Sequence, residues 1–168
     1  LNVVLNGDSY RELELSNETF YEKMEEAKEI PTSSQPAPGE VADIFKKIIS
    51  NGDSVLGIFL SSEMSGTVSS ANMIKNMVLE EYPEGKIEIM DSRTNCMQLG
   101  YVVLEAAKAA KEGATMEKVM EVASKVINSS RFIFAPETLD YLKKGGRIGG
   151  AAALLGNILK IKPILTVR

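Results

Sequence analysis

The sequence predicts an α/β fold: a largely parallel sheet flanked by helices, with a second α/β domain beginning near the end of the chain. Strand-like and helix-like segments alternate along the 168 residues, as in folds built from right-handed crossovers onto a parallel sheet. Residues 55–60 show no alternation of apolar and polar positions, which indicates a strand buried on both faces. Several later segments carry apolar residues at spacings of three and four, the period of a helix with one buried face.

Composition removes several classes of function. The formal net charge of −4 disfavours a nucleic-acid partner, which needs a concentrated basic face. Histidine is absent, so these residues can form neither a Ser-His-Asp relay nor a His-ligated zinc site. No apolar run is long enough for a membrane span, no signal peptide opens the chain, and the single Cys96 suits a reducing compartment. We therefore expect a cytoplasmic protein that needs neither a metal nor a cofactor.

The first segments are two extended stretches and a helix. Residues 1–5 predict a strand, and the turn at 6–8 leads to a second extended stretch at 9–13. Ser16 is a candidate N-cap for the helix that follows, which should end before Pro31.

The middle of the chain predicts two helices on either side of the buried strand. Pro38 suits the first position of a helix that ends at residues 51–52. The helix after the strand is expected to face inward with Val68, Ala71, Ile74 and Met77.

Another strand, residues 87–90, leads into a long helix that should stop at Gly113, and Thr115 should cap the next helix. The long helix is expected to face inward with Leu99, Val103, Ala106, Ala107 and Ala110.

The last segments predict a short buried strand at 132–134, a helix from Pro136 to residues 145–146, a helix of small residues at 151–159 and a final strand at 164–167.

The first candidate site follows the buried strand. In open α/β sheets, ligands bind beyond the carboxyl ends of strands, against helix N-termini. Ser65 falls at such a strand-to-helix turn, Gly66 would let a ligand approach the backbone, and Thr67 opens the helix. Free backbone N–H groups and the helix dipole favour an anion there. The alternative is that Ser65 or Thr67 merely caps the helix.

A second candidate is the proline-bounded loop at residues 31–39. Thr32, Ser33, Ser34 and Gln35 offer adjacent donors that suit a carboxylate. An ordinary turn stabilised by hydroxyl groups is the alternative interpretation.

An enzymatic role has little support in the residues. The segment around Ser65 lacks the G-x-S-x-G elbow, and no histidine can act as its base. The glycine-rich segment 145–150 matches neither the P-loop nor the dinucleotide fingerprint. A phosphate- or nucleotide-handling α/β enzyme using Ser65 and Arg147 stays open as an alternative, as does a regulatory interaction module.

Four stretches, taken in order, resemble the DegV family. They are PTSSQPAPGE at 31–40, SSEMSGT at 61–67, residues 90–92 with 99–100 and 104–107, and TLDYLKKGGRI at 138–148 with 151–155 and 162–166. The resemblance implies a two-domain protein that holds a long-chain fatty acid, similar to the fatty-acid-binding subunit of bacterial fatty acid kinase. A separate ATP-dependent kinase would then phosphorylate the bound carboxylate for phospholipid synthesis.

The resemblance also implies the site. The family's carboxylate-binding hydroxyls match Ser33, where threonine is common in the family, and Ser65. Ser34, Gly66 and Thr67 would support them, and no residue would be catalytic.

The family's earlier strand, and a later domain with a histidine motif, have no match here. We therefore expect a DegV-like domain over residues 1–145, incomplete at its start, and a linker with the beginning of a truncated second domain over 146–168.

Overall fold

The computed structural model describes residues 1–27, 29–154 and 162–167. Its chain divides into two compact units. The first unit contains Leu1–Pro36 and Ala135–Ile164, and the second contains Ala37–Phe134 and Leu165–Arg168. Helices and strands alternate in the second unit as expected, which confirms the α/β class. The domain limits at residues 145 and 146 stay a prediction.

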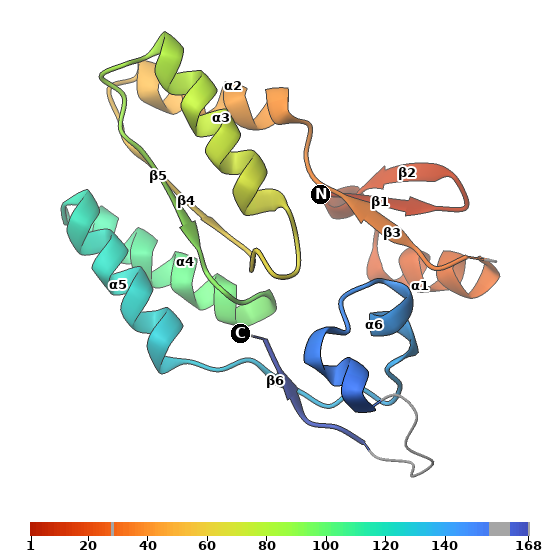
Figure 1. The fold of residues 1–168 in the computed structure, drawn as a ribbon. Helices are drawn as coiled ribbons and strands as arrows, with labels where there is room; N and C mark the ends of the chain where they lie inside the picture. Colours follow the sequence, from red (N-terminus) through yellow and green to blue (C-terminus); the bar gives the residue numbers. More distant parts are fainter. Residues whose placement is uncertain (28, 155–161, 168) are drawn as a thin grey trace. The chain divides into compact units, whose positions relative to one another are not determined.

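The first unit is built on a small antiparallel sheet (Figure 1). Its strands are β1 (Asn2–Leu5), β2 (Asp8–Arg11) and β3 (Thr32–Ser34), in the order β2-β1-β3. Asn6 and Gly7 join β1 to β2 with φ values of 51° and 89°. Positive φ at both central residues is what a two-residue hairpin with a type I′ turn requires. The parallel pairing predicted from the sequence does not extend to this sheet, because the turn forces β2 back along β1.

The helices of the first unit are short. A 3₁₀ turn spans Glu12–Glu14, and α1 spans Asn17–Glu26. Ser16 caps α1 as predicted, since its hydroxyl oxygen accepts a hydrogen bond from the Thr19 backbone N–H at 3.1 Å. The predicted helix from Pro136 begins only at α6 (Asp140–Lys144). The Thr138 hydroxyl accepts a hydrogen bond from the Asp140 N–H at 3.1 Å. This bond stabilises a helix start at Asp140, four residues after the predicted start at Pro136.

The segment after α6 differs from the predicted helix of small residues. A 3₁₀ helix covers Gly149–Leu154, and the rest of the predicted range lies outside the described residues.

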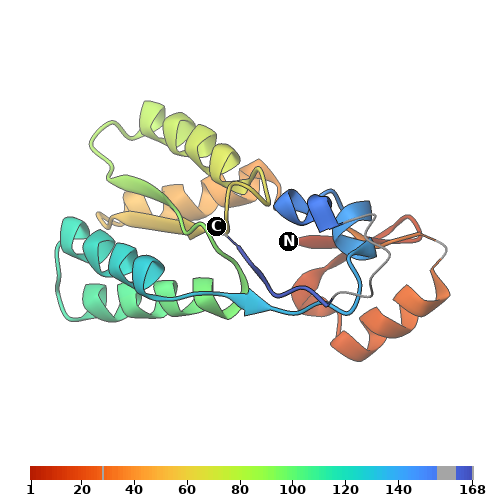
Figure 2. The ribbon, with the colours of Figure 1, turned by 60° about the horizontal axis from the view of Figure 1, so that its bottom comes forward.

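The second unit has three layers (Figures 1 and 2). A central parallel pair of strands lies between two pairs of helices, with Val55 opposite Ile87 and Phe59 opposite Asp91 in register. A short antiparallel ladder completes the unit. The elements are α2 (Pro38–Ser50), β4 (Val55–Phe59), α3 (Thr67–Glu81), β5 (Ile87–Asp91), α4 (Cys96–Lys111), α5 (Met116–Ser129), β6 (Ile133–Phe134) and β7 (Leu165–Thr166).

Each face of the parallel strands has its own apolar core. The α2 and α3 side buries Ala42, Phe45, Ile49, Val55, Ile74, Val78 and Ile87. The α4 and α5 side buries Val102, Ala106, Val119 and Ala123. Pro38 begins α2, and Thr115 caps α5 through the Lys118 N–H, so the helix starts predicted from local signals are confirmed in this unit.

The inward faces of α3 and α4 are only partly as predicted. Met77 is 46% exposed, and Val78 takes the buried position in its place. Val103 is 42% exposed, whereas Val102 is fully buried. Ala107 and Ala110 are also exposed. Because α4 is apolar on most of its circumference, residue spacing alone cannot identify the buried face.

The exposed side of α4 lines an apolar cavity of about 640 Å³. Val103, Ala107 and Ala110 contribute from α4, and consecutive residues 56–59 contribute from β4. Neighbouring residues of a strand point to opposite faces. A cavity that all four of these residues line therefore runs along an edge of β4. Because β5 pairs with the other edge, this is the edge away from β5.

Two further details depart from the sequence-based expectations. Ile133 in β6 is 65% exposed, so this strand is not buried. Cys96 is exposed and has φ of 48°, whereas a free cysteine is usually a small side chain packed in the core. Across the parts of the chain that the structure describes, no helix combines the length and apolar character needed to cross a membrane.

Candidate functional site

Ser65 lies in the connection from β4 to α3, just beyond the carboxyl end of the strand. The backbone turns sharply there. The Ser61 carbonyl accepts hydrogen bonds from the N–H groups of Met64 at 3.0 Å and Ser65 at 3.1 Å. The turn therefore brings Ser65 to the first turn of α3, the position predicted from the strand-to-helix pattern.

The hydroxyl group of Ser65 bonds to the first residue of α3 in a way that can leave its own proton available. Its oxygen accepts from the Thr67 N–H at 3.3 Å and lies 2.7 Å from the Thr67 hydroxyl oxygen. When Thr67 donates across that contact, the Ser65 proton is left to donate to another acceptor. Capping and ligand binding are therefore compatible functions for this residue.

The start of α3 favours a negatively charged ligand. Gly66 is its N-cap residue, without a side-chain cap of its own. No acidic residue lies in the first turn, so no carboxylate of the helix itself neutralises the positive end of its dipole. The arrangement suits a carboxylate or phosphate, the ligand class predicted for this turn.

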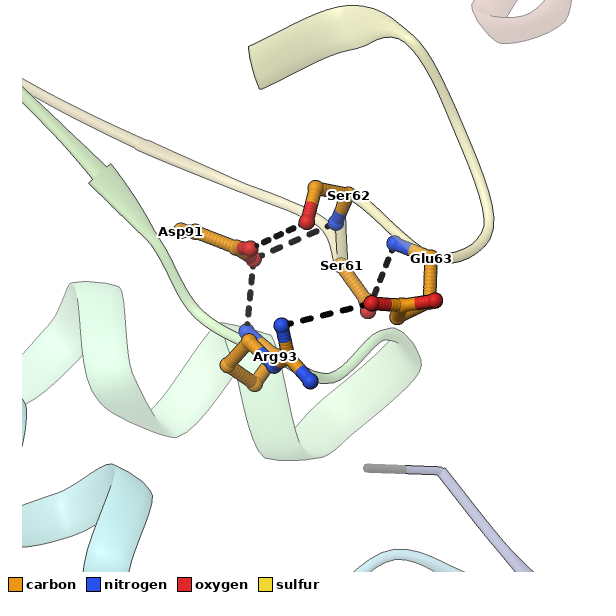
Figure 3. Close-up of polar contacts among 5 residues, drawn as sticks. All are labelled: Ser61, Ser62, Glu63, Asp91 and Arg93. Carbon is orange, nitrogen blue, oxygen red and sulfur yellow. Dashed lines mark hydrogen bonds and ion pairs between the residues drawn. The ribbon is translucent and has the colours of Figure 1, made fainter.

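An acidic residue from the neighbouring strand holds this loop (Figure 3). Asp91, the last residue of β5, accepts from the Ser62 hydroxyl at 2.6 Å and from the Ser62 N–H at 3.3 Å. It also accepts from the Arg93 N–H at 2.8 Å. The Arg93 guanidinium instead pairs with Glu63 at 3.5 Å, between largely exposed side chains. One carboxylate thus joins the loop after β4 to the loop after β5.

Three buried residues with hydroxyl groups lie beneath this cluster and were not among the predicted site residues. Ser61 and Ser92 are 0% exposed and Thr94 is 2% exposed. The Ser61 N–H donates to the Thr94 carbonyl at 2.8 Å, and the Ser92 hydroxyl donates to the same carbonyl at 3.2 Å. A usable signal was present: polar residues directly follow two parallel strands, whose carboxyl ends meet at one edge of the sheet.

Ser33 and Ser34 belong to the first unit, where β3 replaces the predicted loop. Ser33 lies opposite Val3 and Ser34 opposite Asn2 in an antiparallel ladder with β1. The ladder satisfies backbone groups that a loop would leave to solvent, which explains why this polar segment is extended. Both side chains are exposed, so their hydroxyl groups are accessible.

The predicted site residues therefore fall into two groups. Ser65, Gly66 and Thr67 lie together in the second unit, and Ser33 and Ser34 lie together in the first. Their roles in binding a carboxylate stay predictions.

The basic residues near the end of the chain lie at the end of α6. Lys143 and Lys144 occupy its last turn, and Arg147 donates to the Gly145 carbonyl at 2.6 Å. All three side chains are exposed. Cations at a helix C-terminus interact favourably with its dipole.

Sequence comparison links the whole chain to one family. The sequence model of the DegV family, described as "Uncharacterised protein, DegV family", matches residues 1–168. A DegV domain-containing protein of Clostridium acetobutylicum is 53% identical over 167 residues, covering 99% of this chain and 58% of the relative. The chain thus spans somewhat more than half the length of such relatives.

Solved structures show the same fold. A DegV family protein of Thermus thermophilus, described by its fatty acid binding, is 34% identical with a TM-score of 0.86. A stearic acid-binding protein of Eubacterium ventriosum is 28% identical with a TM-score of 0.87. Each similarity covers 99% of this chain and 58% of the other protein.

Proposed function

This chain belongs to the DegV family, and on that premise we propose that it binds a long-chain fatty acid by its carboxylate, through Ser33 and Ser65. The observation that carries the proposal is the match over nearly the whole chain to two solved proteins described as binding fatty acids. The turn at Ser65 adds chemical support, because it combines a hydroxyl donor with a helix N-terminus free of acidic residues.

The tail and the carboxylate of a fatty acid contribute to binding in different ways. An acyl chain contributes about 0.8 kcal/mol for each buried CH₂ group, so the apolar tail supplies most of the affinity. A carboxylate is costly to bury unless it receives strong hydrogen bonds. Neutral hydroxyl groups supply such bonds without neutralising the carboxylate. One carboxylate oxygen therefore stays able to act as a nucleophile.

We infer that the protein presents this carboxylate to an ATP-dependent partner kinase and has no catalytic residue of its own. Phosphoryl transfer depends on phosphate positioning and metal ions, which the kinase would supply. The product would be an acyl phosphate for lipid metabolism. Under this proposal, the hydroxyl groups of this protein fix the carboxylate while one of its oxygen atoms attacks the terminal phosphorus of ATP. The bond to the bridging oxygen breaks, and ADP leaves.

Mass spectrometry of the whole protein as purified tests the binding proposal. Native spectra should show one added mass, and organic extraction should release an equimolar long-chain fatty acid. Ser65→Ala should retain less of it, by about tenfold, because a charge-assisted hydrogen bond is lost. Ser69→Ala, at an exposed position of α3, is the matched control and should retain the wild-type amount.

Two results would contradict the proposal. A lipid-free protein that also fails to bind added oleate would remove fatty acid binding altogether. Wild-type lipid content in a folded Ser65→Ala variant would remove Ser65 from the site while leaving the ligand class in place.

A further inference from the structure

We propose that Asp91 is a positioning residue for the carboxylate site, acting on Ser65 through the loop after β4. This inference rests on the proposed function, since it assigns a role in the same site. Asp91 is fixed by the parallel ladder, in which it lies opposite Phe59. Its carboxylate therefore provides a fixed point at the sheet edge where the two loops meet.

The connection from Asp91 to Ser65 runs through two sets of hydrogen bonds, at Ser62 and at Ser61, which the peptide bond between these two residues joins. Asp91 binds both the hydroxyl and the backbone N–H of Ser62, at 2.6 and 3.3 Å. The preceding residue, Ser61, is fully buried, and its carbonyl accepts the Ser65 N–H at 3.1 Å. Fixing Ser62 therefore fixes the turn that carries the Ser65 hydroxyl.

A second contact shows that the loop after β5 is also shaped around Asp91. The Arg93 N–H donates to the Asp91 carboxylate at 2.8 Å, and Arg93 has φ of 54°. This left-handed conformation is unfavourable for a residue with a side chain and persists only where surrounding contacts require it. The guanidinium of Arg93 pairs with Glu63. The contact between Arg93 and Asp91 is therefore made by the Arg93 backbone N–H and not by its charged side chain.

Asp91 accepts three hydrogen bonds with two oxygen atoms, which defines the informative substitutions. Alanine removes all three. Asparagine keeps one oxygen for the two N–H groups and can donate its amide to the Ser62 hydroxyl, so most of the geometry should survive. Glu63→Ala is the matched control, because Glu63 is also acidic, lies in the loop that Asp91 binds, and pairs with Arg93 at the exposed surface.

The test compares binding of a fatty acid with binding of the fatty alcohol of equal chain length. The two ligands share the apolar tail, so their affinity ratio reports the carboxylate contact alone. In the whole protein, Asp91→Ala should lower the acid-to-alcohol ratio about tenfold, whereas Asp91→Asn should stay within about threefold of wild type. Glu63→Ala should leave the ratio unchanged. Amide exchange at Ser62 should rise in Asp91→Ala, because its acceptor is lost.

The outcomes separate the positioning role from the proposed function. If Ser65→Ala lowers the ratio and folded Asp91→Ala does not, the positioning role is wrong and the proposed function stands. If neither substitution changes the ratio, the carboxylate site itself is wrong. If Asp91→Ala fails to fold, the same measurement on Ser62→Ala tests the positioning role instead. This substitution removes only the 2.6 Å bond, and an unchanged ratio in that variant overturns the inference.

Discussion

Ser33 and Ser65 each carry a hydroxyl group, but Ser33 lies in a strand and Ser65 lies in a turn. Ser65 sits in a turn whose carbonyl and N–H groups are bonded within the loop, so its position is set by hydrogen bonds. Ser33 lies in a short edge strand and is exposed. Its side chain is free to change rotamer, since a serine carries no second group on Cβ. The Ser33 contact should therefore be the more adjustable of the two.

Substitutions at Ser33 test this difference. Ser33→Thr keeps the donor, restricts χ1 and suits a strand, so fatty acid retention should rise or stay equal. Ser33→Ala should lower retention, by about tenfold or less, because the hydroxyl is lost. Fluorescent fatty acid displacement measures both. Thr32→Ala, on the neighbouring strand position, serves as the control, and equal losses at both positions would argue against a specific role for Ser33.

Residues that act locally were predictable, and those that act across the fold were not. Ser16 and Thr115 cap helices through N–H groups three residues away, a relation that sequence spacing contains. Asp91 binds Ser62 from 29 positions away. The parallel pairing of β4 and β5 brings them together. The sequence marks that edge of the sheet as polar, but it does not specify which side chains bond to each other there.

At the scale of elements, β4 shows why its central glycine is needed. A Cβ atom on Gly57 would lie 2.7 Å from Cε2 of Phe59 and 3.1 Å from Cδ1 of Ile89. Both side chains pack against the core on the α2 and α3 side. The space that a side chain at position 57 would occupy is therefore already filled by its neighbours, and one of them must move to admit even a methyl group.

Alanine substitutions at two glycines should change stability in opposite directions. Gly57→Ala should lower the free energy of unfolding by about 1 kcal/mol or more through overpacking. Gly39→Ala should raise it by about 0.5 kcal/mol, because the site lies in the first turn of α2 with nothing within 4 Å of the added atom. Urea unfolding measures both. A neutral Gly57→Ala would mean that the Phe59 ring moves aside at little cost.

Helix existence was easier to predict than helix orientation. All of α2, α3, α4 and α5 begin or end near signals visible in the sequence, such as Pro38 and Gly113. The buried side of α4 was not visible, because apolar residues surround most of the helix. The structure resolves this by burying Val102 and Ala106 and leaving Val103 at the cavity along β4.

At the scale of the whole molecule, the two units carry different parts of the proposed function. The second unit holds the Ser65 turn, and the first holds Ser33 and the basic end of α6. The family resemblance in the sequence correctly identified the DegV family. The division of the predicted site between units could not be foreseen, because chain segments distant in sequence, residues 1–36 and 135–164, form one unit.

The basic residues of α6 provide a test of the partner rather than of the ligand. Lys143, Lys144 and Arg147 are exposed at the end of a helix that begins with Asp140. Complementary charge mainly affects association rate and partner selectivity. Replacing all three with glutamate should slow acyl phosphate formation by an added fatty acid kinase and weaken its salt dependence, while lipid content stays at the wild-type level.

A matched control separates a specific contact from a general change in net charge. Lys108 and Lys111 on α4 and Lys125 on α5 lie exposed in the other unit. Replacing these three with glutamate makes the same change in net charge and should leave kinase kinetics unchanged. Reversing charges at a helix C-terminus lowers the free energy of unfolding by about 0.3–1 kcal/mol for each residue. The thermal stability of each variant must therefore be measured together with the kinetics. Unchanged kinetics in the α6 variant would show that the kinase approaches another surface, because a surface that steers association cannot lose its charge without a change in rate.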